Sequence, residues 1–128
     1  MIHHEKKMIL GATLLACIFV ALAFFIKASS TKNSNPHQYD LFAQCLTKAS
    51  VVMYGAAWCP HCQATKAAFA DSFKFVTYVE CVNNSTLCAK KGVDAYPTWL
   101  IGTTSKIEGF DSNTFHYLST ATGCALPQ

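Results

Sequence analysis

Two cysteines separated by two residues are the side chains in this sequence most able to carry chemistry. Residues 58–62 read Trp-Cys-Pro-His-Cys, directly after a β-rich run. If a helix begins at Cys59, the unpaired N–H groups of its first turn and the positive end of its dipole favour a thiolate there. Pro60 suits a first turn, His61 adds partial positive charge, and Cys62 lies close enough to close a disulfide. The spacing therefore predicts a redox-active pair.

Three other uses of the same pair fit the sequence less well. A zinc site needs four ligands, and the next two cysteines, Cys81 and Cys88, are separated by six residues. Haem attachment places histidine directly after the second cysteine, where this chain has Gln63. A purely structural disulfide across so short a loop would be strained and a poor staple. We therefore expect no metal and no cofactor at the pair.

Hydrophobic patterns predict the elements that must position the pair. A charge-free run at residues 51–55 precedes it and is typical of a strand covered on both faces. An alanine-rich helical pattern begins at the first cysteine. The expected helices are residues 35–49, 59–70, 85–92 and 111–123, and the other expected strands are residues 73–80, 98–101 and 106–110. Strands that alternate with helices and end in a hairpin predict an α/β fold with parallel pairs and a final antiparallel pair.

A second feature is a stretch of 19 uncharged residues at 8–26, which is long enough to cross a bilayer. Lys6 and Lys7 precede it and favour a cytoplasmic N-terminus at residues 1–7. The polar, Ser/Asn-rich residues 27–38 that follow are typical of a flexible linker. We therefore predict a transmembrane signal anchor, a linker, and a small folded domain beyond it.

Two alternatives for this stretch remain open. Residues 21–23 read Ala-Leu-Ala and resemble a signal-peptidase site, which would leave a cleaved leader in place of an anchor. Residues 14–17 read Leu-Leu-Ala-Cys and resemble a lipoprotein signal, although the residues after Cys17 stay apolar. All three interpretations export the rest of the chain.

Charge argues against one class of partner. The formal net charge of the chain is +3, and it contains no arginine. From His37 onward six lysines balance six acidic residues, so the excess charge lies near the apolar stretch. A nucleic-acid-binding protein needs a basic face, and we therefore expect no nucleic-acid partner.

The remaining cysteines predict disulfides. Six of the seven lie outside the apolar stretch, and an even number in a small exported domain favours covalent staples. We hypothesise that Cys81 pairs with Cys88 across a short turn, and by elimination that Cys45 pairs with Cys124. The alternative for both is a second redox couple that relays electrons to the first pair.

The motifs also resemble a known family. Trp58 to Cys62 after a β-run, with Tyr96-Pro97-Thr98 further on, resembles a thioredoxin-fold oxidoreductase over residues 39–124. The segments YGAAWCPHCQ, YVEC and GVDAYPTW and the closing Gly-Cys are most similar to the thioredoxin-like domain fused to bacterial vitamin K epoxide reductase homologues. The CPHC sequence is also that of the periplasmic oxidase DsbA.

The resemblance implies a fold and roles for individual residues. The fold is thioredoxin-like, a four-stranded mixed sheet flanked by helices. Cys59 is the nucleophile, Cys62 is the resolving thiol, and Pro97 is a cis proline against the pair. The side chains implied to shape or tune the docking surface are Trp58, Pro60, His61, Tyr96 and Pro97. The family often buries an acid six residues before the first cysteine; Met53 stands there, and Glu80 is an alternative acid.

Together these observations predict a membrane-anchored thiol oxidase on the extracytoplasmic, or periplasmic, side of the cell membrane. Its expected substrates are exported cysteine-containing proteins. Its expected redox partner is a membrane quinone-linked protein such as a vitamin K epoxide reductase-like protein. The alternatives are a disulfide reductase or isomerase on the same fold, and a redox-inactive binding or assembly module.

Overall fold

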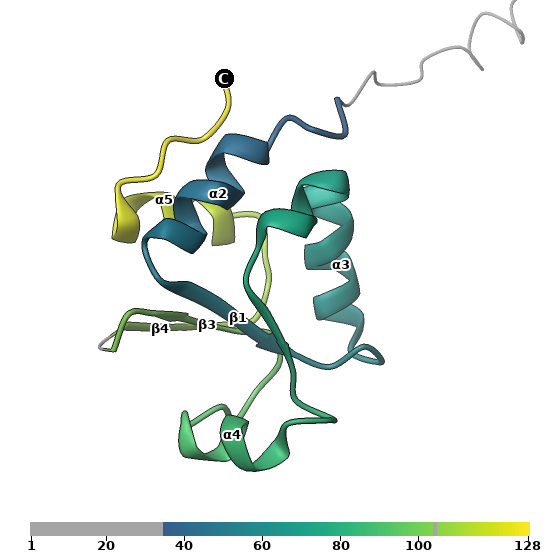
Figure 1. Ribbon diagram of the computed structural model, residues 1–128. Coiled ribbons are helices and arrows are strands. Elements are labelled where there is room, and N and C mark those ends of the chain that lie inside the picture. Colours follow the sequence, from purple (N-terminus) through teal and green to yellow (C-terminus); the bar gives the residue numbers. More distant parts are fainter. Residues whose placement is uncertain (1–34, 104) are drawn as a thin grey trace, which may run out of the picture. The chain divides into compact units, whose positions relative to one another are not determined.

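Four strands form one mixed sheet in the order β2-β1-β3-β4 (Figure 1). The computed structural model describes residues 35–103 and 105–128. Strand β1 pairs in parallel with β2 and antiparallel with β3, and β3 pairs antiparallel with β4. The strands are β1 Val51–Gly55, β2 Tyr78–Glu80, β3 Thr98–Ile101 and β4 Ser105–Glu108. The predicted α/β fold with a four-stranded mixed sheet is confirmed.

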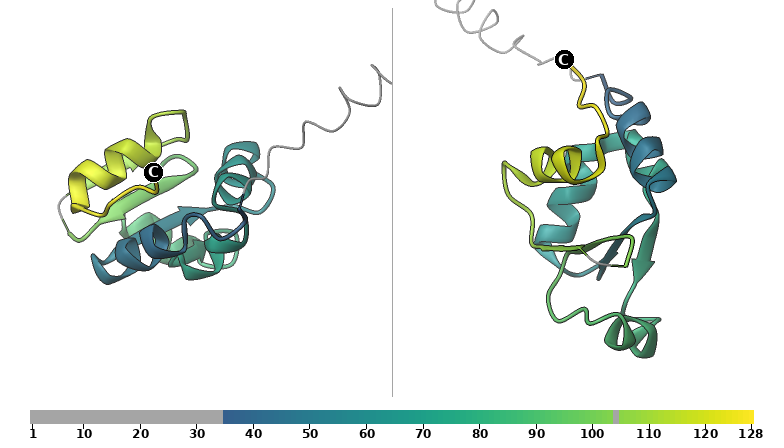
Figure 2. Two further views of the ribbon diagram at one scale, coloured as in Figure 1. Left: turned by 90° about the horizontal axis from the view of Figure 1, so that it is seen from above. Right: turned by 90° about the vertical axis from the view of Figure 1, so that its left-hand side faces the viewer.

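The helices cover both faces of this sheet. Helices α2, α3 and α5 lie on one face and α4 lies on the other, as the views in Figures 1 and 2 agree. Their bounds are α2 Asp40–Lys48, α3 Pro60–Phe69, α4 Ser85–Lys90 and α5 Thr114–Thr122. A 3-10 helix, η1 Ala70–Phe75, continues directly from α3.

Alternating side chains of the central strands divide the core into two clusters. Met53 and Trp99 are fully buried in the larger cluster, with apolar side chains of α2, α3 and α5. Tyr54 lies in the smaller cluster, which also contains side chains from the segment around α4. Because neighbouring strand residues point to opposite faces, both faces of β1 are covered. This explains why residues 51–55 contain no charge.

Several predicted boundaries are wrong; the last helix, for example, begins at Thr114 and not at residue 111. Residues 73–80 were expected to form one strand, but η1 occupies the first part and β2 begins only at Tyr78. The chain turns at Ala70, whose φ is +49°, and Phe73 then packs edge-on against Phe69 instead of extending. The first helix begins at Asp40, because residues 36–39 form turns.

The predicted membrane segment, residues 8–26, and the linker up to residue 34 lie outside the residues that the structure describes. Among residues 35–103 and 105–128, no helix has both the length and the apolar character needed to cross a membrane.

Candidate active site

The turn between β1 and α3 places Cys59 at the start of a helix. Cys59 is the N-cap residue of α3, with extended backbone angles, and Pro60 occupies the first turn. The N–H of Cys59 donates to the carbonyl of Ala56 at 3.1 Å, and the N–H of Gln63 donates to the carbonyl of Cys59 at 3.0 Å. The Cys59 side chain therefore lies at the positive end of the helix dipole.

The two cysteines of the motif differ in accessibility. Cys59 keeps 5% of its surface exposed, whereas Cys62 is fully buried. Neither forms a disulfide in this structure. Burial raises the pKa of the Cys62 thiol to about 11; hydrogen bonding to the Ala56 backbone opposes this rise, and the interaction with Cys59 adds to it. An incoming sulfur can reach Cys59 more readily, which suits it to form the bond with a substrate.

A cis peptide bond brings a second segment to the pair. The Tyr96–Pro97 bond is cis, and the Cys59 Sγ donates to the Tyr96 carbonyl at 3.6 Å. Trp58 is 68% exposed, and its ring lies edge-on to that of Tyr96 at 6.2 Å between centroids. The structure thus brings together Trp58, Cys59, Tyr96 and Pro97, residues that are far apart in sequence. His61 is exposed beside them on the first turn of α3.

The buried cysteine has neighbours that the sequence analysis did not single out. A Cβ added at Gly55 would lie 2.6 Å from the Cys62 Sγ and 3.3 Å from the Tyr78 ring. The Lys66 Nζ lies 3.9 Å from the centre of that ring. From the sequence alone, only the four-residue spacing of Cys62 and Lys66 on a predicted helix could have indicated that Lys66 lies near Cys62. The alternative acid, Glu80, accepts a hydrogen bond from the Tyr78 hydroxyl at 2.7 Å.

The other four cysteines within residues 35–103 and 105–128 form two disulfides. Cys81 is joined to Cys88, which ties the end of β2 to α4, and both are buried. Cys45 on α2 is joined to Cys124, which follows α5. The chain after α5 accordingly turns back toward α2 (Figure 2).

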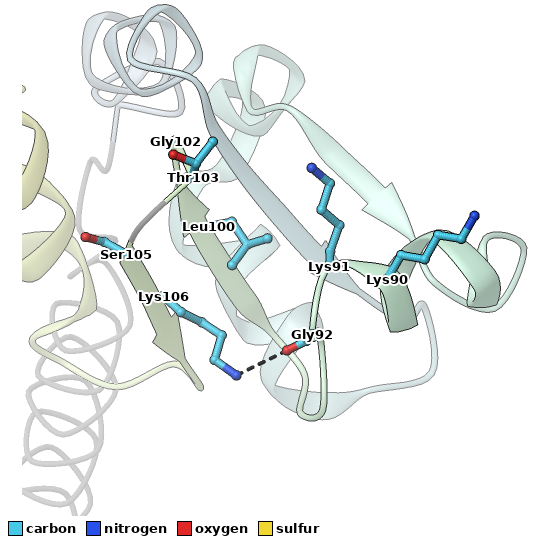
Figure 3. A pocket seen from close by; sticks show the side chains of 8 residues that line it. All are labelled: Lys90, Lys91, Gly92, Leu100, Gly102, Thr103, Ser105 and Lys106. Atoms are coloured by element: carbon cyan, nitrogen blue, oxygen red, sulfur yellow. Dashed lines mark hydrogen bonds between the residues drawn. The ribbon is translucent and has the colours of Figure 1, made fainter.

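A surface cavity of about 410 Å³ lies elsewhere, beside the β3–β4 hairpin (Figure 3). Its Lys106 donates to the carbonyl of Gly92 at 3.1 Å and pairs with Glu108 at 2.7 Å and Asp94 at 3.7 Å. The lining residues are Lys90, Lys91, Gly92, Leu100, Gly102, Thr103, Ser105 and Lys106. None belongs to the cysteine turn or to the cis-proline segment, so the candidate active site is the cysteine pair and not this cavity.

Fold and site together define a thioredoxin-like domain with a two-cysteine motif at a helix start. Residues 30–115 match the family model described as Thioredoxin. The chain belongs to the thioredoxin family.

Curated relatives include proteins named for disulfide chemistry. The chain is 30% identical over 86 residues to the thiol-disulfide oxidoreductase LTO1 of Arabidopsis thaliana, covering 60% of this chain and 23% of that protein. It is 38% identical over 77 residues to protein disulfide-isomerase A5 of Bos taurus, covering 52% of this chain and 15% of that protein. It is 32% identical over 98 residues to protein disulfide-isomerase MPD1 of Saccharomyces cerevisiae, covering 65% of this chain and 31% of that protein. The chain spans less than a third of the length of each.

Solved structures similar to this chain include two thioredoxins. Thioredoxin from Fasciola hepatica matches with 26% identity and a TM-score of 0.43, over 56% of this chain and 78% of that one. Thioredoxin NaTrxh from Nicotiana alata matches with 18% identity and a TM-score of 0.46, over 56% of this chain and 70% of that one.

Proposed function

We propose that this chain is a membrane-anchored, extracytoplasmic thiol–disulfide oxidoreductase that donates the Cys59–Cys62 disulfide to exported proteins. The observation that carries the proposal is the asymmetry of the pair: Cys59 is the N-cap of α3 beside the Tyr96 carbonyl, and Cys62 is buried behind it. Membership of the thioredoxin family and similarity to proteins named as thiol-disulfide oxidoreductases support it.

The chemistry proceeds by two sulfur displacements. A substrate thiolate attacks the Cys59 sulfur of the disulfide; a substrate–Cys59 bond forms, the Cys59–Cys62 bond breaks, and its electron pair leaves on the Cys62 sulfur. A second substrate thiolate then attacks the substrate sulfur of the mixed disulfide, and Cys59 leaves as a thiolate. The substrate loses two electrons and two protons in all, and the cysteine pair gains them.

Substrate docking is assigned to the exposed surface around Cys59. Trp58, next to Cys59 in sequence, and Tyr96, whose carbonyl accepts from the Cys59 thiol, provide a joint aromatic surface near the thiol. The peptide before Pro97 offers backbone groups with which an extended substrate can pair as an added strand. Pro60 and His61, in the first turn of α3, are placed to tune the thiol.

Two features support the oxidising direction. The position of Cys59 at a helix start and the histidine in the CPHC sequence are the features we take to favour the reduced form of the pair, and a more stable reduced form makes the disulfide a stronger oxidant. The CPHC sequence and the resemblance to domains fused to vitamin K epoxide reductase homologues suggest the electron acceptor. We assign reoxidation to a separate quinone-linked membrane protein of that kind.

Trapping of mixed disulfides tests the mechanism. A Cys62→Ala variant of the full chain keeps Cys59 but lacks the thiol that releases substrates. It is expected to accumulate exported proteins linked through Cys59, and the Cys59→Ser/Cys62→Ala variant, as control, to accumulate none. Absence of these complexes, with unchanged thiol oxidation in cells lacking the protein, would overturn the proposal.

The reduction potential of the pair decides the direction. Equilibration of the full chain with glutathione, read by mass spectrometry of the alkylated Cys59–Cys62 peptide, is expected to give a value near that of DsbA, about −120 mV. A value near that of thioredoxin, about −270 mV, would instead assign the chain as a reductase or isomerase. Similarity to two protein disulfide-isomerases is the observation that favours this second candidate.

A redox-inactive role has its own test. If the chain is a binding or assembly module, a Cys59→Ser/Cys62→Ser variant should restore function in cells that lack the protein. The proposed exchange chemistry requires that this variant fail.

A further inference from the structure

The buried thiol of Cys62 must carry a negative charge during exchange. When the disulfide is opened at Cys59, the electron pair leaves on Cys62; when a mixed disulfide is resolved, Cys62 attacks as a thiolate. Both directions of the proposed function pass through this thiolate, and the following inference rests on that chemistry. Burial opposes the charge, because Cys62 is fully shielded from solvent. A compensating charge near Cys62 would therefore speed exchange in either direction.

The structure places a lysine, Lys66, near the buried thiol of Cys62. Lys66 follows Cys62 by one turn of α3, so the two side chains lie on the same side of the helix. The Lys66 Nζ lies 3.9 Å from the centre of the Tyr78 ring and 5.5 Å from that of Phe73. The Tyr78 ring is itself next to Cys62, because a single Cβ at Gly55 would contact both side chains.

Tyr78 and Glu80 hold this lysine in place. The face of an aromatic ring attracts an ammonium group, and Tyr78 presents its face to Lys66. The Tyr78 hydroxyl donates to the Glu80 Oε2 at 2.7 Å, which fixes the ring. This hydrogen bond also lowers the pKa of Glu80, so Glu80 stays ionised and its charge favours an ammonium nearby.

The other groups that reach Cys62 cannot supply positive charge. The titratable side chains that interact with Cys62 are Cys59 on the cysteine turn, Lys66 on α3 and Tyr78 on β2. The Glu80 carboxylate lies behind them, bonded to the Tyr78 hydroxyl. Burial, followed by the hydrogen bond to Glu80, raises the pKa of Tyr78 well above its usual range, so Tyr78 stays neutral. The side facing β1 is apolar, with Met53 fully buried there. Within this described set Lys66 is the cation, and its charge lowers the pKa of Cys62.

We propose that Lys66 is the positive charge that stabilises the Cys62 thiolate during exchange, and that Tyr78 and Glu80 are positioning residues for its ammonium group. Lys66 transfers no proton in this step. The electron pair of the broken disulfide stays on the Cys62 sulfur until solvent or the departing thiol protonates it.

Titration of the lone Cys62 thiol tests the proposal directly. The full-length chain carries Cys17→Ser and Cys59→Ser, and the ultraviolet absorbance of its thiolate is followed against pH after subtraction of the same chain with Cys62→Ala. Lys66→Met is expected to raise the pKa of Cys62, by up to about one unit, as for loss of one nearby opposite charge. An unchanged titration curve overturns the proposal.

Two matched variants separate charge from structure. Lys66→Arg keeps the positive charge and is expected to leave the Cys62 titration close to that of the parent chain. If Lys66→Arg raises the pKa as much as Lys66→Met, the lysine acts only through its shape and the proposal fails. Lys74→Met removes another lysine over an aromatic ring, 5.0 Å from Phe75, and should leave the titration unchanged. An equal shift in this variant would also overturn the assignment.

A kinetic measurement distinguishes this inference from the proposed function. The oxidised full chain is mixed with dithiothreitol across a range of pH, and the Lys66→Met variant is expected to open its disulfide roughly threefold more slowly, because the leaving thiol is more basic. If the parent chain exchanges readily but Lys66→Met changes neither rate nor titration, the inference fails alone. If the titration shifts but no substrate protein is ever trapped on Cys59, the proposed function fails and the charge assignment stands.

Discussion

At the scale of single residues, the two thiols of the motif lie in different surroundings although only two residues separate them. Cys59 retains slight exposure at a helix start, whereas Cys62 is covered by Gly55, Tyr78 and the turn. A thiol in such a position resists ionisation, and this resistance links the protonation of Cys62 to the stability of the fold. The environment of Cys62 therefore sets both the pKa of its thiol and the pH dependence of the free energy of unfolding.

The first prediction concerns stability at high pH. The pKa of Cys62 is raised from 9.0 to about 11, so between these values the unfolded chain loses a proton that the folded chain keeps. The free energy of unfolding should therefore fall as pH rises through this window, by on the order of 2 kcal/mol. Urea unfolding of the Cys59→Ser chain at several pH values measures the fall. The matched Cys59→Ser/Cys62→Ala chain lacks the titrating thiol, and parallel curves for the two chains would contradict the prediction.

The second prediction concerns Gly55. Its hydrogen faces the Cys62 sulfur so closely that a Cβ would lie 2.6 Å from it, with the Tyr78 ring 3.3 Å away. Gly55→Ala is therefore expected to lower the free energy of unfolding by about 1–3 kcal/mol through overpacking. Urea unfolding provides the measurement, and Ala64→Ser on the exposed side of α3 serves as control. Equal stability of Gly55→Ala and the parent chain would contradict the prediction, because it would show that the Cys62 side chain can shift to accommodate the added methyl group.

At the scale of elements, the parts of the site that are local in sequence could be predicted and the parts that depend on packing could not. The strand at residues 51–55 and the helix start at Cys59 follow from composition, a proline and a helix pattern. The 3-10 turn after α3 could not be predicted, because Phe73 and Phe75 favour strands in isolation and turn inward only through their packing partners. The Lys66–Tyr78 contact likewise depends on the register of β2 beside β1, which no local pattern specifies.

The third prediction ranks the two disulfides by the loop that each closes. The Cys45–Cys124 bond spans 79 residues of sequence and the Cys81–Cys88 bond spans seven. Loss of loop-closure entropy in the unfolded chain then amounts to about 4–5 kcal/mol for the first bond and about 2 kcal/mol for the second. The Cys45→Ala/Cys124→Ala chain should accordingly unfold at lower urea concentration than the Cys81→Ala/Cys88→Ala chain.

Both double variants keep Cys59 and Cys62, so both should still exchange disulfides with dithiothreitol when they are folded. Greater instability of the Cys81→Ala/Cys88→Ala chain would contradict the ranking. It would mean that packing of these two buried sulfurs in the smaller core cluster outweighs the length of the loop.

At the scale of the whole molecule, the domain and the apolar N-terminal stretch provide different information about function. Family membership rests on residues 30–115, and it establishes a thioredoxin-like domain. The expected location rests on residues 8–26, whose lack of charge is a property of the sequence. A tethered domain meets its substrates and its redox partner at the membrane surface, so the anchor would decide which thiols Cys59 encounters.

The fourth prediction tests this anchor. Because residues 8–26 carry no charge over a length that spans a bilayer, the full chain should remain in the membrane fraction after alkaline carbonate extraction. A chain lacking residues 8–26 should lose this association, and full-length Cys59→Ser should keep it, since redox chemistry plays no part in insertion. The mass of the extracted protein separates an intact anchor from a leader cleaved near residue 23. Release of the full-length chain by carbonate would contradict the predicted anchor. The protein would then meet the substrates of Cys59 by free diffusion and not at the membrane surface.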